Sequence, residues 1–221
     1  MTFKDICRSE VSGWKTTEII YLVALATIQL ALCLYMGYSP ANTICSTLGV
    51  ISVVISAKGK LLYFPLYLIY SILYGIISFK GSYYGQSILY LALLAPMCIV
   101  GCRNWFKNFN VKTGEINKNS LSWKTRILGA LVIAVVIVGL SFVLRHFGDK
   151  QPIVDASATI FVVSAFFLTM FRYIENWWIW VVSNTVNITL WLIDKDYAMV
   201  VMFAIFLLNS IVALIRWQRN M

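Results

Sequence analysis

Apolar residues fill eight long runs along the chain, each near the length of about 20 residues that a helix needs to cross a bilayer. Short polar connections such as 58–60 and 194–196 separate most of them. The pattern therefore predicts an all-α integral membrane protein with eight transmembrane helices. The runs cover residues 19–36, 41–57, 61–79, 83–102, 125–145, 155–170, 175–192 and 197–216.

Two segments lie outside this pattern. Residues 1–18 carry charges of both signs, and their apolar positions recur every three to four residues, at Phe3, Cys7, Val11 and Trp14. We expect this N-terminal segment to form a short amphipathic helix at the membrane interface. Residues 103–124 are polar and rich in Asn and Lys. They predict a linker between two halves of the protein.

Composition and charge support a membrane protein and give its orientation. The chain is 60% hydrophobic and 12% charged, with a mean hydropathy of +0.79, which excludes an ordinary soluble domain. With eight crossings, 14 of the 18 Lys and Arg residues fall on the side that holds both termini and the long linker. The positive-inside rule places that side in the cytoplasm. The net charge of +9 thus indicates orientation in a lipid bilayer, not a nucleic-acid partner.

An offset of 112 residues aligns the chain with itself. The matches are sparse in identity, but the hydropathy pattern and the short basic loops coincide. Each repeat holds three helices, and the second begins four crossings after the first, so both have the same orientation. We expect one transmembrane transporter domain, 19–217, with a substrate site between the repeats near the membrane midplane. Its predicted parts are a leading helix, repeat one (41–105), a linker helix (125–145) and repeat two (155–217). The residue pairs matched by the 112-residue offset are Ser52 with Ser164, Lys60 with Arg172, Ser71 with Ser183, Ile99 with Ile211 and Trp105 with Trp217.

The strongest candidate site is a stripe on the run 175–192. Trp177, Trp180 and Asn184 share one helical face, and two indoles with an amide can hold a flat, partly polar molecule. An aromatic belt at the membrane interface is the alternative. It accounts for Trp177 and Trp178, but Asn184 lies about 10 Å deeper along the axis.

Other polar residues in the apolar runs are further candidates for the substrate site. A neutral amide in hydrocarbon is costly unless it is paired or faces a cavity. The alternative for each of them is a hydrogen bond between helices, worth about 0.6–2 kcal/mol. These candidates are Gln86, Tyr83, Tyr90, Asn187, Asn42 and Thr43.

Several kinds of chemistry have no support in the sequence. No Asp, Glu, Lys, Arg or His lies in the middle of any run, which argues for passive, uncoupled transport of a neutral or cationic solute. There is no phosphate-binding loop and no nucleophile with a base, so we expect neither ATP drive nor an enzyme. The five cysteines form no CxxC pair and fit small core residues, so no metal or cofactor is expected.

Four stretches resemble the PnuC family of bacterial vitamin transporters, and the likeness extends over about residues 18–217. The Trp-x-x-Trp element resembles the nicotinamide riboside branch, whereas thiamine and riboflavin relatives differ there. The resemblance implies a SWEET-like 3+1+3 core after one leading helix, and a homotrimer in the bacterial inner membrane. It also implies facilitated diffusion of nicotinamide riboside, trapped by a cytoplasmic riboside kinase. The stretches are TLGVISVVISAKGK at 47–60, YGIISFK at 74–80, YGQ at 84–86 and ENWxxWxxxN at 175–184.

The residues agree with such a substrate without identifying it. Indole faces attract a cationic pyridinium ring, and Asn184 and Gln86 can bond its amide or the ribose hydroxyls. A phosphate would need Arg or Lys at depth, so we expect the mononucleotide to be rejected. We expect alternating access with no ion moved alongside. Thiamine or another flat vitamin on the same fold remains an alternative, as does a membrane receptor that does not transport.

Overall fold

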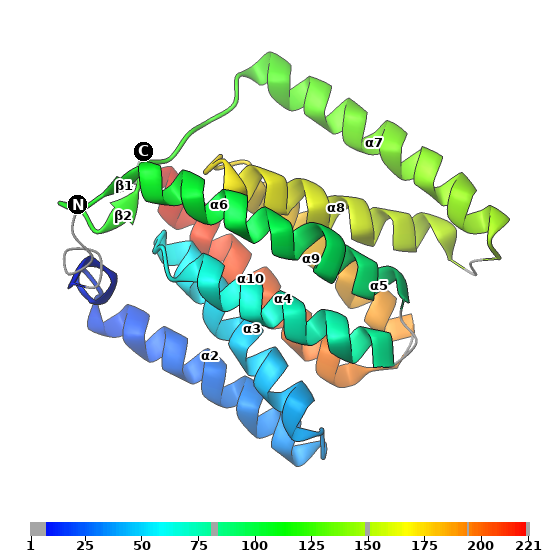
Figure 1. Cartoon of the computed structure of the whole chain (residues 1–221), viewed down its shortest axis with the longest axis horizontal. Helices are drawn as coiled ribbons and strands as arrows, with labels where there is room; N and C mark the ends of the chain where they lie inside the picture. The colour runs from blue at the N-terminus through cyan, green and yellow to red at the C-terminus, as the bar shows by residue number, and fades with distance from the viewer. Residues whose placement is uncertain (1–7, 81–83, 149–150, 194, 220–221) are drawn as a thin grey trace. The chain divides into compact units, whose positions relative to one another are not determined.

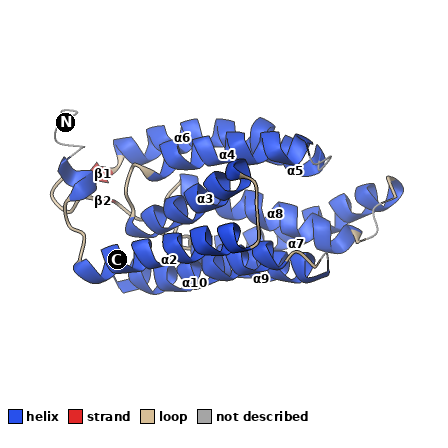
Figure 2. Cartoon of the chain, turned by 90° about the horizontal axis from the view of Figure 1, so that it is seen from below, coloured by secondary structure: helices blue, strands red, loops and turns tan. Residues whose placement is uncertain are grey.

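The computed structural model describes residues 8–80, 84–148, 151–193 and 195–219 (Figure 1). It divides into two compact units. Unit 1 is 1–117 with 170–172, and unit 2 is 118–169 with 173–221. Helices make up almost all of the described chain, and the strands form one short pair (Figure 2).

Unit 1 contains a leading helix, three further membrane-length helical segments and a small hairpin. The third segment is interrupted by a π-helical turn, and the hairpin follows it directly. The hairpin strands β1 and β2 pair antiparallel, with Phe109 opposite Ile116. The elements are α2 (Thr16–Tyr35), α3 (Pro40–Lys58), α4 (Tyr63–Lys80), α5 (Tyr84–Ile88), η1 (Leu89–Leu94), α6 (Ala95–Lys107), β1 (Phe109–Asn110) and β2 (Glu115–Ile116).

Local sequence signals account for both ends of α3. The Ser39 hydroxyl accepts a hydrogen bond from the Asn42 N–H at 3.3 Å, and Pro40 occupies the first helical position. Gly59 ends the helix in the left-handed region at φ 74°, a conformation that glycine adopts without steric cost. The start of the short α3–α4 connection is therefore set by Gly59.

Glycines allow close helix contacts in unit 1. A Cβ added at Gly101 of α6 would lie 2.3 Å from the Phe64 ring of α4, and one at Gly75 of α4 would lie 2.4 Å from Leu91. Around these contacts α4 and α6 form an aromatic core. The Trp105 ring is fully buried and meets Phe64 edge-on at a centroid distance of 5.0 Å. The core thus depends on shape as much as on hydrophobicity.

The predicted helix 83–102 is not a uniform α-helix. The Ala95 N–H bonds to the Tyr90 carbonyl, five residues back, within the π-helical turn η1. Pro96 follows at once and has no N–H to give to the carbonyl one α-turn earlier. A looser turn at this point avoids that conflict, and such π-turns are frequent at functional sites.

The predicted linker 103–124 is more structured than its polar composition indicated, because β1 and β2 lie within it. It packs against the N-terminal segment and the α3–α4 connection. The Lys60 ammonium, whose side chain is 1% exposed, donates to the carbonyls of Ser9, Ser12 and Gly114 at 2.6, 2.9 and 2.7 Å. We call these four residues the Lys60 junction.

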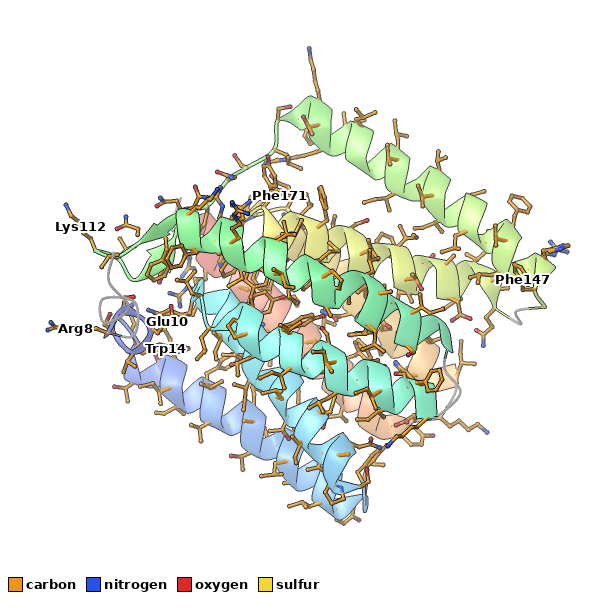
Figure 3. All side chains as sticks on the ribbon, viewed as in Figure 1. Arg8, Glu10, Trp14, Lys112, Phe147 and Phe171 are labelled. Atoms are coloured by element: carbon orange, nitrogen blue, oxygen red, sulfur yellow. The ribbon has the colours of Figure 1, made fainter. Side chains whose placement is uncertain are left out.

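The N-terminal segment adds further polar contacts at the same end of unit 1. Both Glu10 carboxylate oxygens accept from the backbone N–H groups of Leu61 and Leu62, each at 3.0 Å, just before α4 begins. Figure 3 shows Glu10 on the first helical turn and Trp14 just after it, with Lys112 on the nearby hairpin. The expected surface helix 1–18 is described only from residue 8. Its described part, 8–14, docks through polar bonds rather than through an apolar face.

The described residues of unit 2 form four helices. α9 and α10 pack against each other along their lengths. Most of the apolar side chains of α7 are exposed in the single chain. The helices are α7 (Trp123–His146), α8 (Pro152–Met170), α9 (Asn176–Ile193) and α10 (Tyr197–Arg219).

Seven helices among the described residues are long and apolar enough to cross a membrane. This confirms the prediction of a helical, multi-pass membrane protein. A helix lies in each of the eight predicted runs, but α9 is not among the seven. α9 is also the helix that carries Asn184 and Asn187, so two of the polar side chains that lower its hydropathy belong to the candidate site.

Candidate functional site

The start of α9 is fixed by bonds from the segment that precedes α7 and from the first turn of α7. The Glu175 carboxylate oxygen Oε1 accepts from the Leu121 N–H at 3.1 Å and lies 2.7 Å from Nη2 of Arg126. The Ile174 N–H donates to the Asn119 carbonyl at 2.9 Å. α9 therefore begins at a defined place, and the side chains along its first three turns have defined positions in unit 2.

Trp177 is part of the packed interior of unit 2. Its ring meets the Trp217 ring of α10 edge-on, with 5.4 Å between centroids, and both side chains are buried. The Lys118 ammonium lies 5.5 Å from the centroid of the Trp217 ring. Among the described residues, nothing hydrogen-bonds to the Trp177 indole N–H. Trp177 thus packs against Trp217, while its indole N–H remains available to donate to another group.

Trp180 differs from Trp177 in both exposure and bonding. Its side chain is half-buried, and its indole N–H donates to the Thr169 hydroxyl of α8 at 3.1 Å. The Thr169 hydroxyl in turn bonds to the Ala165 carbonyl at 2.9 Å. The indole is held by its polar edge, and this leaves its face available to stack on a flat ligand.

Asn184 of the stripe and the nearby Asn187 are both buried, and their amides are bonded through the nitrogen atoms. Asn184 Nδ2 donates to the Ser210 hydroxyl of α10 at 3.1 Å. Asn187 Nδ2 donates to the Ser183 carbonyl on the preceding turn at 2.9 Å. Buried amides at this depth of a helix fit a polar site better than a membrane-interface belt.

The site on α9 is electrically neutral. α9 contains no Asp, Glu, Lys, Arg or His, and in α10 the first such residue is Arg216, in its last turn. The electrostatic attraction that α9 can offer a ligand therefore comes from amide dipoles and aromatic quadrupoles. Such a surface suits a cation or a neutral molecule and offers nothing to balance an anion.

The remaining predicted site residues belong to unit 1. Tyr90 lies in the π-helical turn, where its ring contacts Tyr74 at 4.3 Å and Tyr70 at 5.8 Å between centroids. Gln86 is half-buried in α5. Tyr83 lies outside the described residues.

The first turn of α3 holds the other two candidates. Asn42 is half-buried, and its backbone N–H is used in the Ser39 cap. Thr43 is buried, and no described residue hydrogen-bonds to its hydroxyl. Unit 2 thus brings together Trp177, Trp180, Asn184 and Asn187, while unit 1 holds the other described candidates.

Two residues that hydrogen-bond to the stripe were missed from the sequence. Thr169 and Ser210 lie on α8 and α10, separated by 11 and 26 residues from the side chains that they bond. A signal was present for Ser210, because it forms a polar pair with Asn209 inside an apolar run. Thr169 has no such signal, since an isolated threonine in a membrane helix bonds its own backbone in most cases.

Comparison with known proteins gives consistent matches. The family model described as "Nicotinamide mononucleotide transporter" matches residues 39–219. The chain is 27% identical over 225 residues to "Nicotinamide riboside transporter PnuC" of Neisseria mucosa, covering 96% of this chain and 84% of that protein. It is 26% identical over 211 residues to the protein of the same name from Haemophilus influenzae, covering 95% and 92%.

A solved structure shares the fold. "Crystal structure of the Vitamin B3 transporter PnuC" matches with a TM-score of 0.86 and 25% sequence identity, over 99% of this chain and 97% of that one. The match spans both units, so the likeness extends beyond the candidate site to the whole chain.

Proposed function

The chain belongs to the nicotinamide mononucleotide transporter family, and on that basis we propose that it carries nicotinamide riboside across a membrane by facilitated diffusion. The family consists of multi-pass membrane transporters, not enzymes, in agreement with the sequence prediction. The observation that carries the choice of substrate is the lack of charged side chains on α9, where Trp180 and Asn184 of the stripe lie beside Asn187.

The stripe has a matching group for two parts of the riboside. The Trp180 face attracts the cationic pyridinium ring, an interaction worth about 2 kcal/mol when both partners are desolvated. The amides of Asn184 and Asn187 can bond the carboxamide or the ribose hydroxyls. We propose that Trp177 also lines the site and that its indole N–H donates to the ligand. Gln86, Tyr83, Tyr90, Asn42 and Thr43 remain proposed contacts contributed by the first repeat.

The same stripe argues against the mononucleotide in the family's description. A phosphate needs Arg, Lys or several backbone N–H groups to replace its hydration. Neither α9 nor α10 before Arg216 offers a basic side chain. We therefore propose the riboside, whose hydroxyls are neutral, as the transported form.

Isothermal titration of the purified protein should show saturable binding of nicotinamide riboside, with no measurable binding of nicotinamide mononucleotide. Thiamine belongs in the same panel, because it is also flat and cationic. Binding of thiamine alone would keep the fold and replace the substrate. Equal binding of riboside and mononucleotide would contradict the argument from the missing basic residues.

We propose that transport is uncoupled and proceeds by alternating access. The support is the absence of Asp, Glu, Lys, Arg and His from α9 and from α10 before Arg216. Proteoliposomes are expected to equilibrate the riboside at the same initial rate with or without a sodium or proton gradient. A rate that collapses when either gradient is removed would overturn this part of the proposal. If transport is uncoupled, accumulation in the cell depends on a cytoplasmic riboside kinase that consumes the free substrate.

The architecture completes the proposal. We propose α9 as the eighth span, giving a leading helix and a SWEET-like 3+1+3 core in the bacterial inner membrane, with both termini cytoplasmic. Equivalent positions in the two proposed repeats are similarly buried, namely Trp105 with Trp217 and Ser71 with Ser183. The exposed apolar side chains of α7 fit contact with lipid or with other copies in a homotrimer.

A further inference from the structure

The Ser210 hydroxyl has one hydrogen atom, and its surroundings decide where that hydrogen goes. Ser210 Oγ lies 2.7 Å from the Phe206 carbonyl oxygen, one turn earlier on α10, and 3.1 Å from the Asn184 amide. A carbonyl oxygen can only accept, so the Ser210 hydrogen is donated to Phe206. The hydroxyl oxygen can then serve Asn184 only as an acceptor.

This direction fixes the orientation of the Asn184 side chain. An amide that faces a pure acceptor must present its NH₂ group, and its carbonyl oxygen then points the other way. The two distances support this assignment, because the single Ser210 hydrogen is donated across the shorter contact, 2.7 Å to Phe206 against 3.1 Å to Asn184. Asn184 is 2% exposed and Ser210 is 3% exposed, so water cannot readily replace either partner.

The Asn184 carbonyl oxygen is therefore left as an acceptor. Among the residues that the structure describes, none hydrogen-bonds to it. Asn187 repeats the arrangement one turn further on, because its NH₂ group is used on the Ser183 carbonyl. The two amide oxygens are acceptors, so a ligand that satisfies them must bring N–H or O–H donors.

We propose that Ser210 is a positioning residue that holds the Asn184 amide with Oδ1 directed at the ligand, where it accepts an N–H of the substrate's carboxamide. Asn184 lies about 6 Å along the helix axis from Trp180. A carboxamide attached to a pyridinium ring stacked on Trp180 lies within reach of that oxygen. This inference rests on the proposed function and adds the selection of the carboxamide.

Thr169 acts on Trp180 in the same way. Its hydroxyl donates to the Ala165 carbonyl at 2.9 Å and accepts the Trp180 indole N–H at 3.1 Å. Two hydroxyls, each bonded back to its own helix, thus orient the aromatic ring and the acceptor of the stripe. A site is pre-organised before the ligand arrives when the side chains that contact the ligand are held in place by such partners.

The test compares two ligands that differ in one group. Nicotinamide riboside carries a carboxamide, and its acetyl analogue carries CH₃ in place of NH₂, with the same charge and nearly the same shape. Titration of the wild-type protein is expected to favour the riboside by about 30-fold, since a buried acceptor left without its donor costs about 2 kcal/mol. Equal affinities in the wild type would overturn the inference, whatever the variants do.

The Ser210→Ala variant is expected to lose this selectivity. Without the hydroxyl, the Asn184 amide can turn and offer N–H to the acetyl oxygen, so the affinity ratio should fall about tenfold. Ser210→Thr keeps a hydroxyl that bonds back to the helix and should retain the wild-type ratio. Thr185→Val is the matched control, because Thr185 bonds back to the Val181 carbonyl at 2.9 Å but is exposed.

The outcomes separate the inference from the proposed function. A ratio that stays the same in Ser210→Ala, or that falls equally in Thr185→Val, overturns the role of Ser210 and leaves riboside transport standing. A wild-type protein that binds neither ligand overturns the proposed function and this inference together. A ratio that falls in Ser210→Ala and is retained in Ser210→Thr and Thr185→Val supports both.

Discussion

Replacement of Trp180 by alanine is expected to raise the Kd for nicotinamide riboside by about 30-fold, because the variant loses a desolvated cation–π contact worth about 2 kcal/mol. The indole is held by Thr169 through its N–H, so its face is already positioned before the ligand binds. Isothermal titration of the purified variant gives the Kd directly. A thermal melt of the same sample shows whether the protein remains folded.

Trp178 provides the control for this measurement. It lies on the same helix, but its side chain is 56% exposed and points away from the packed interior of unit 2. Trp178→Ala should change the Kd by no more than about twofold, as expected for a surface substitution. Equal losses in the two variants would mean that the tryptophans act as a membrane-interface belt and that Trp180 does not contact the ligand.

Replacement of Lys60 by methionine is expected to reduce the stability of the folded protein by about 3 kcal/mol, because the carbonyl groups of Ser9 and Gly114, which are buried, and that of Ser12 lose their shared donor. Methionine has a similar length and no polar atom that can donate to them. The midpoint of thermal unfolding in detergent should therefore fall by several degrees. Circular dichroism or intrinsic tryptophan fluorescence follows the transition.

Lys107→Met is the matched control for the Lys60 variant. Lys107 is exposed in the last turn of α6, and its replacement removes the same charge from unit 1. Its unfolding midpoint is expected to stay close to that of the wild type. If both variants fell equally, the effect would come from net charge rather than from the bonds of the Lys60 junction.

The membrane helices could be predicted closely from the sequence because their signal is local. The run 41–57 became α3 at Pro40–Lys58, and the run 125–145 became α7 at Trp123–His146. Apolar length and the capping residues Ser39, Gly59 and Ser122 lie within a few positions of the helix ends. The π-helical turn before Pro96 was not predicted, since a proline inside an apolar run is equally compatible with a kink.

Contacts between distant segments were harder to predict. Hydropathy places Asn184 at depth, and helical spacing places it on one face with Trp180, but neither says which group bonds to it. The partners Ser210 and Thr169 follow only from the packing of α10 and α8 against α9. The polar linker is a similar case, because its hairpin is stabilised by bonds to loops that are distant in sequence. An example is the bond of the Ile116 N–H to the Gly59 carbonyl.

The Lys60 junction also constrains the order in which the protein can be made. Its three acceptors lie 51, 48 and 54 residues away along the chain, on both sides of Lys60. During synthesis the ammonium therefore cannot complete its bonds until Gly114 has left the ribosome, after the fourth predicted membrane segment. Until that moment the charge needs water, so the α3–α4 loop and the N-terminal segment stay hydrated while the first helices are inserted. The nascent chain thus closes this end of unit 1 late, and a fragment that stops before the hairpin lacks the Gly114 acceptor.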